Sequence, residues 1–169
     1  MDVLIVDGYN IIGAWDELVR LKKRSISEAR DRLIEILSEY KAYSGLKIII
    51  VFDALYAKGL ESKQAINNLE VIFTKEKETA DECIERLVDS VKHVKNEVYV
   101  ATSDYAEQRI IFGRGALRIS ARELLINIEN IDHNISDSIQ NLPRYDGLLK
   151  SRIDKETLTR LEEIRRRGK

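Results

Sequence analysis

Acidic side chains follow three predicted strands, at the point where each strand ends. They are Asp7, Asp53 and Asp104, and a fourth acid, Asp81, lies in the first turn of a predicted helix. Carboxylates that crowd together repel one another at neutral pH unless a cation neutralises them or some keep their protons. If the fold brings these acids together, the pattern predicts a cation site, to which Asp53 is an additional candidate.

Oxygen ligands without clustered histidines or cysteines favour Mg²⁺ or Mn²⁺. The two histidines, His93 and His133, lack metal-ligand spacing, which argues against zinc. A divalent ion held by carboxylates can polarise a phosphodiester, lower the pKa of a bound water and orient that water for attack. The leading hypothesis is therefore phosphodiester hydrolysis at an ion held by three or four of these acids, of which Asp53 is the weakest candidate.

Two polar residues accompany these acids. Asn10 lies three residues after Asp7, where its amide could hydrogen-bond a metal-bound water or a substrate phosphate, and we count it among the catalytic candidates. Ser103, which immediately precedes Asp104, could do the same. Each acid alone also has a purely structural interpretation, because an aspartate after a strand is often a helix N-cap or a turn former. The combination of residues carries the functional hypothesis.

Substrate binding is marked by arginines and aromatic residues near the same predicted edge. Arginine presents a planar fork of donors that suits phosphate, and tyrosine rings can stack on unpaired bases. A solvated basic face and ordinary core packing would explain the same residues without any ligand. The candidates for RNA binding are Arg109, Arg114, Arg118, Tyr9 and Tyr105.

The elements that must position these residues alternate between strand and helix. Apolar runs predict strands at residues 3–6, 46–52, 69–73 and 97–101, with a polar loop at 54–67. Three capping boxes predict helix starts, because a Ser or Thr is followed three residues later by a Glu. They are Ser25 with Glu28, Thr79 with Glu82 and Ser120 with Glu123.

Strands that alternate with helices predict an α/β fold with a mostly parallel sheet that is covered on both faces. In such sheets, ligands bind beyond the carboxyl ends of the strands, where the connecting loops converge. This topology would deliver Asp7, Asp53 and Asp104 to one edge, and Asp81 could join them from its helix.

Size and composition set outer limits on the interpretation. The 169 residues suit one principal hydrophobic core, and the longest fully apolar run, residues 48–52, is too short to cross a bilayer. We therefore expect no membrane span. The single cysteine, Cys83, cannot form an internal disulfide, so nothing requires an oxidising compartment and we expect a cytoplasmic protein. A net charge of -1 means that a nucleic acid would have to be attracted by a local patch.

Four segments together resemble the YacP-like NYN domains of bacteria, a branch of the PIN-like nucleases. They are Val6-Asp7-Gly8-Tyr9-Asn10, Val51-Phe52-Asp53-Ala54, Thr79-Ala80-Asp81-Glu82 and Thr102-Ser103-Asp104-Tyr105. The resemblance covers residues 1–142 and implies a PIN-like (NYN) three-layer fold, in which helices flank a central, mostly parallel sheet. Residues 143–169 would then form a C-terminal helical extension.

The resemblance implies a metal-dependent endoribonuclease, with Asp7, Asp81 and Asp104 matching the family's acidic site and Asn10 its accompanying amide. It also implies Mg²⁺ or Mn²⁺, an RNA substrate that is single-stranded or messenger RNA, and the ribosome as a partner. Related proteins often carry an acid where Ala106 stands, which leaves the number of metal ions open. A non-catalytic module that binds RNA or the ribosome is the alternative, and the oligomeric state is left open.

Overall fold

The structure is a computed structural model that describes residues 1–53, 62–92, 96–104, 113 and 115–140, with side chains described as far as residue 131. The chain divides into two compact units, Met1–Asp132 and His133–Lys169. The boundary predicted at residue 142 and the predicted C-terminal extension lie outside the described residues. No helix in the described part of the chain is long and apolar enough to span a membrane.

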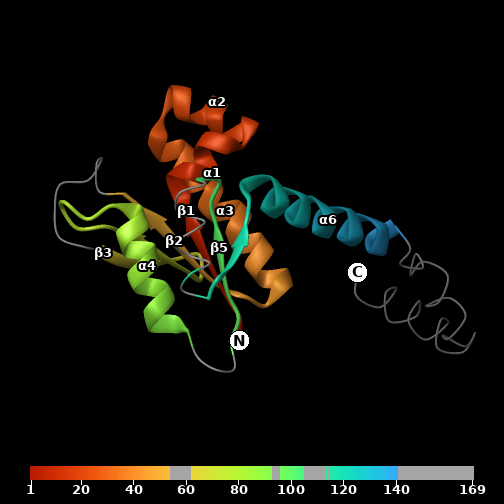
Figure 1. Cartoon of the computed structure of the whole chain (residues 1–169). Helices are drawn as coiled ribbons and strands as arrows, with labels where there is room; N and C mark the ends of the chain where they lie inside the picture. The colour runs from red at the N-terminus through yellow and green to blue at the C-terminus, as the bar shows by residue number, and fades with distance from the viewer. Residues whose placement is uncertain (54–61, 93–95, 105–112, 114, 141–169) are drawn as a thin grey trace, which may run out of the picture. The chain divides into compact units, whose positions relative to one another are not determined.

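The first unit is built on one sheet with the strand order β3-β4-β2-β1-β5-β6. Every neighbouring pair is parallel except β3 and β4, which are antiparallel. The predicted α/β fold with a mostly parallel sheet is therefore confirmed (Figure 1). The strands are β1 (Val3–Asp7), β2 (Lys47–Phe52), β3 (Ser62–Ile66), β4 (Leu69–Phe73), β5 (Val98–Ala101) and β6 (Leu117–Ile119).

Helices cover both faces of this sheet, which confirms the predicted three layers. Successive side chains of a strand point to opposite faces, so Ile50 packs with the helices of one face and Val51 with the helix of the other. Both layers are apolar, as expected for parallel strands that are buried on two sides. The first face carries α1 (Gly8–Ala14), α2 (Asp16–Arg24), α3 (Ile26–Ser44) and the start of α6 (Ala121–Gln140), and the second carries α4 (Ala80–Val91).

The helices α3, α4 and α6 begin at the predicted caps. Thr79 Oγ1 accepts from the backbone N–H of Glu82 at 3.2 Å, and Glu82 Oε2 accepts from the Thr79 N–H at 3.0 Å. The Ser120 box is reciprocal in the same way, whereas Ser25 accepts from the Glu28 N–H at 3.3 Å. Each cap satisfies N–H groups that a helix end would otherwise leave without partners.

Two regions differ from the sequence-based expectation. Residues 8–24 form α1 and α2 where only a turn was predicted, although Ile11, Trp15 and Leu18 are buried at the spacing of an amphipathic helix and so offered a local signal. Residues 62–66 form the edge strand β3 where a polar loop was predicted. The two-residue turn that follows β3 has positive φ at Asn67 (48°) and Asn68 (64°), a conformation that asparagine tolerates and that suits tight hairpins.

Candidate active site

The acids predicted to meet do lie at one edge of the sheet. Asp7 is the last residue of β1, Asp53 follows β2 directly, and Asp104 follows β5 after two further residues. These strands are parallel neighbours, with Asp7 opposite Val51 of β2 and Val6 opposite Ala101 of β5. Their carboxyl ends therefore point the same way, toward α1 and α2 (Figure 1).

A pocket of about 420 Å³ opens at this edge. Three of its lining residues are aspartates from separate parts of the chain, and one residue is a lysine. The described residues that line it are Asp7, Tyr9, Asn10, Lys22, Asp53, Thr79, Ala80 and Asp81. The fold thus gathers side chains from β1, α1, α2, the end of β2 and the start of α4 around one cavity.

Asp7 is the most buried of these acids, with 8% of its surface exposed. Burial raises the pKa of Asp7 from its ordinary value of 3.8 to about 6, and the hydrogen bond from the Asn10 N–H opposes this rise. The negative charges of Asp81, Asp104 and Asp53 raise the pKa of Asp7 further. The Asp7 carboxylate is therefore costly to ionise, and a bound cation would relieve that cost.

Asp81 belongs to the same electrostatic group. Desolvation raises the pKa of Asp81, followed by the charges of Asp104, Glu85 and Asp53 and a smaller effect of Glu82. Asp7 and Asp81 thus each sense Asp53 and Asp104, although these acids are far apart in sequence. The structure brings the four predicted acids into one negative field.

The acids are not arranged as a ready-made metal cage. Within the described part of the chain, no three Asp, Glu, His or Cys side chains are grouped closely enough to hold an ion together. The donor chemistry nevertheless fits a hard cation, because carboxylate oxygens line the pocket and Mg²⁺ usually takes only one or two carboxylates and keeps several waters. Shared coordination by Asp7, Asp81 and Asp104 stays a prediction.

Asn10 and Ser103 join the loops around the pocket. The Oδ1 atom of Asn10 accepts from the backbone N–H of Ser103 at 2.7 Å, which ties α1 to the segment after β5. Ser103 Oγ in turn accepts from the N–H of Ala121 at 3.3 Å. With its oxygen engaged, Asn10 has the two N–H donors of its amide to offer to water or phosphate.

Two sets of hydrogen bonds fix the start of α4, which carries Asp81. The capping box at Thr79 orders its first turn. Arg86 donates from Nε and Nη2 to Oε1 of the buried Glu78, at 3.1 and 3.0 Å, and so ties the preceding linker to the second turn of the helix. Hydrogen bonds between charged groups are stronger than those between neutral groups, which helps to hold this linker in place.

Gly8 allows the acidic strand ends to pack closely. A Cβ atom added there would lie 2.3 Å from Cε1 and 2.5 Å from Cδ1 of the fully buried Phe52 ring. Phe52 immediately precedes Asp53, and its ring also contacts Tyr9, with centroids 5.1 Å apart. The absence of a side chain at Gly8 thus helps to set the spacing between Asp7 and Asp53.

The predicted RNA-binding residues have different positions. Tyr9 lines the pocket but also packs on the core ring of Phe52. Its position is therefore compatible both with stacking on an RNA base and with ordinary core packing. Arg118 is exposed on β6. The remaining candidates, Tyr105, Arg109 and Arg114, lie outside the described residues.

Lys22 was missed by the sequence analysis. It stands in the last turn of α2, a helix that was not predicted, and it lines the acidic pocket. Neighbouring Lys23 and Arg24 are equally basic but do not line the pocket. A run of three basic residues gives no signal for which of them faces a site, because that depends on how the helix is oriented.

Comparison with known proteins decides the family. The family model of the YacP-like NYN domain matches residues 4–166. The chain belongs to the YacP-like NYN domain family. This family is a branch of the PIN-like nucleases, and the match continues past residue 142, the predicted end of the resemblance.

Relatives of this NYN domain come from Bacillus subtilis. The chain is 49% identical over 166 residues to the protein YacP of strain 168, covering 98% of each chain. The crystal structure of Rae1 (YacP) from Bacillus subtilis matches with a TM-score of 0.74 and 49% identity, over 98% of this chain and 95% of that one. A tryptophan-to-leucine mutant of Rae1 matches with the same score over 83% and 82%.

Proposed function

We propose that this NYN domain is a metal-dependent endoribonuclease that hydrolyses phosphodiester bonds of RNA. The main support is the pocket at the carboxyl edge of the sheet, which Asp7, Asp53 and Asp81 line and to whose negative field Asp104 contributes. Membership of a nuclease family supports the reaction class. The gathered carboxylates support the use of a divalent cation, which we expect to be Mg²⁺ or Mn²⁺.

In this proposal, Asp7, Asp81 and Asp104 hold the ion, either directly or through its waters, and Asp53 adds to the negative field. A bound divalent ion would polarise the scissile phosphate and lower the pKa of a water. Asn10 would orient a water or a phosphate oxygen through its amide N–H groups, because its Oδ1 is held by Ser103. The buried position of Asp7 limits competing water around its carboxylate.

The test is cleavage of a labelled single-stranded RNA by the full chain with Mg²⁺, with Mn²⁺ and with a chelator. We expect cleavage only with metal, and a loss of at least about 100-fold in Asp7→Asn and Asp81→Asn, because even supporting residues of metal sites often contribute 10- to 100-fold. Asp31→Asn is the matched control, since Asp31 is exposed on α3 and lines no part of the pocket.

Unchanged cleavage in correctly folded Asp7→Asn and Asp81→Asn would refute this site. RNA binding without metal-dependent cleavage on any substrate would instead favour the non-catalytic alternative. The two outcomes are separable, because binding is measured on the same RNA by fluorescence anisotropy.

We further propose, from the family resemblance, that messenger RNA on the ribosome is the natural substrate and that the protein acts in the cytoplasm. The experiment compares cleavage of one message when free and when engaged by translating ribosomes, at equal Mg²⁺. Preferential cleavage of the engaged message supports ribosome association. Equal cleavage of both would contradict it while leaving the nuclease proposal intact.

A further inference from the structure

We infer that Lys22 binds a backbone phosphate of the RNA substrate in the acidic pocket. This inference rests on the proposed nuclease function and extends it by assigning the group that recognises the phosphate. Among the described residues that line the pocket, Lys22 is the only cation, and it faces a cavity shared with three aspartates.

The position of Lys22 is set by the buried part of α2. Leu18 is fully buried and lies one helical turn before Lys22, so the two side chains project from the same side of the helix. Trp15, at the junction of α1 and α2, is also buried, and its Nε1 donates to the carbonyl of Ala121 at 2.8 Å. The base of the lysine is therefore anchored, while its long stem leaves the ammonium free to adjust to a ligand.

The Lys22 ammonium is not committed to a structural ion pair. No hydrogen bond or ion pair ties it to another residue of the described ranges, even though Asp7, Asp53 and Asp81 line the same pocket. By contrast, Arg86 of α4, the helix that begins at the pocket, is bound to Glu78. An ammonium that is held near a site without a fixed partner is suited to a mobile anion such as a phosphate oxygen.

The charge of the pocket explains why such a group is needed. A phosphodiester carries a negative charge and is repelled by three carboxylates, and a divalent ion offsets only part of their charge. A lysine that lines the same pocket adds attraction without occupying a metal ligand position. Because a point charge does not read bases, the contact would favour any RNA backbone rather than one sequence.

A simpler interpretation is that Lys22 only stabilises the C-terminal end of α2, where basic residues are favoured by the helix dipole. That explanation applies equally to Lys23, which has the same charge, is exposed and is the next residue of the same turn. Lys23 does not line the pocket, so Lys23→Ala is the matched control.

The experiment measures cleavage kinetics of a labelled single-stranded RNA of mixed sequence by the full chain with Mg²⁺. We expect Lys22→Ala to raise KM about tenfold or more, as befits a lost charged hydrogen bond, while kcat changes by less than about threefold. Lys23→Ala should stay close to the starting protein, and Lys22→Arg should restore most of the affinity. Equal KM effects in Lys22→Ala and Lys23→Ala would overturn the inference.

A second measurement keeps this test separate from the nuclease proposal. Equilibrium RNA binding is followed by fluorescence anisotropy in the Asp81→Asn background, at several salt concentrations. If Lys22 binds one phosphate, Lys22→Ala reduces the slope of log affinity against log salt by about 0.7, and Lys23→Ala does not. An unchanged slope overturns the inference, whether or not the starting protein cleaves RNA, and a starting protein that binds no RNA overturns both proposals.

Discussion

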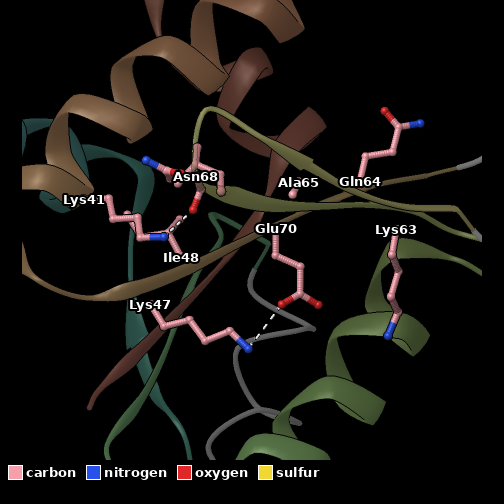
Figure 2. A pocket seen from close by; sticks show the side chains of 9 residues that line it. Lys41, Lys47, Ile48, Lys63, Gln64, Ala65, Asn68 and Glu70 are labelled. Carbon is pink, nitrogen blue, oxygen red and sulfur yellow. Dashed lines mark hydrogen bonds and ion pairs between the residues drawn. The ribbon is translucent and has the colours of Figure 1, made fainter.

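The two ends of the sheet carry two pockets of similar size and opposite character. The acidic pocket, about 420 Å³, lies at the carboxyl ends of β1 and β2, whereas a pocket of about 470 Å³ lies at the opposite ends, where β2 and β4 begin. Lysines line this second pocket (Figure 2). Its described lining is Lys41, Lys47, Ile48, Lys63, Gln64, Ala65, Asn68, Leu69 and Glu70.

The pockets differ in how their charges are compensated. In the lysine-lined pocket, Lys47 pairs with Glu70 at 3.2 Å, and Lys41 donates to the backbone carbonyl of Asn68 (Figure 2). In the acidic pocket, burial raises the pKa of both Asp7 and Asp81, and the charges of Asp53 and Asp104 raise both pKa values further. Gathered like charges need a ligand to relieve them, and internally paired charges do not. Charge compensation, rather than volume, thus distinguishes the candidate active site.

The largest effect on stability that we expect comes from Asp7. Its pKa of about 6 in the folded protein lies above the ordinary value of 3.8, so ionised Asp7 opposes folding by as much as about 3 kcal/mol above pH 7. Between about pH 4 and pH 6, Asp7 therefore stays largely protonated in the folded protein but is ionised in the unfolded chain. The Asp7 contribution to stability is therefore present at about pH 4 and is lost as pH rises through about 6.

Asp7→Asn should consequently raise the free energy of unfolding of the metal-free protein by up to about 3 kcal/mol at pH 8, and by little at pH 4. Asparagine can still accept from the Asn10 N–H as an N-cap, so α1 keeps its start. Chemical denaturation in chelator, with Asp31→Asn beside it, measures the difference. If Asp7→Asn is less stable than the starting protein at pH 8, the Asp7 charge is not an uncompensated one, and the two pockets do not differ as described.

A second prediction concerns the packing behind the acids. Gly8→Ala forces a Cβ into the Phe52 ring and should lower the free energy of unfolding by about 1–3 kcal/mol. Gly13→Ala is the control in the same helix, because nothing lies within 4 Å of its added Cβ, and it should be neutral or slightly stabilising. Thermal denaturation of both variants checks this, and equal effects would show that the close approach at Gly8 is unimportant.

The smallest effect is expected at the other end of the sheet. Lys47 and Glu70 have 40% and 33% of their side-chain surface exposed, so their ion pair contributes less than about 1 kcal/mol. Lys47→Ala should change the unfolding free energy by no more than this and should leave RNA cleavage unaltered. A marked loss of cleavage in Lys47→Ala would show that the lysine-lined pocket takes part in function. Charge compensation would then not distinguish the candidate active site from this second pocket.

Much of the fold could be predicted from local signals. Buried parallel strands appear as continuous apolar runs, and the caps at Thr79 and Ser120 mark helix starts by side-chain chemistry that needs no tertiary contact. The convergence of Asp7, Asp53 and Asp104 followed from one topological rule, because each ends or follows a parallel strand.

The missed parts have different causes. Helix α2 had a local signal, because Trp15, Leu18 and Leu21 recur at helical spacing. The facing of Lys22 had none, since it depends on Trp15 anchoring the helix junction on α6, a contact between residues far apart in sequence. Strand β3 is mostly exposed and has a weak apolar pattern. Its turn residues, Asn67 and Asn68, were the one signal of the hairpin, since asparagine is favoured at positive φ.

Binding of Mn²⁺ to the full chain, measured by isothermal titration calorimetry at pH 7.5, tests most directly whether the acidic pocket is a cation site. We expect saturable binding by the starting protein and by Glu70→Gln, which removes a carboxylate from the lysine-lined pocket, and at least about tenfold weaker binding by Asp7→Asn. Equal binding by Asp7→Asn and the starting protein, or no binding by any of the three, would contradict this expectation.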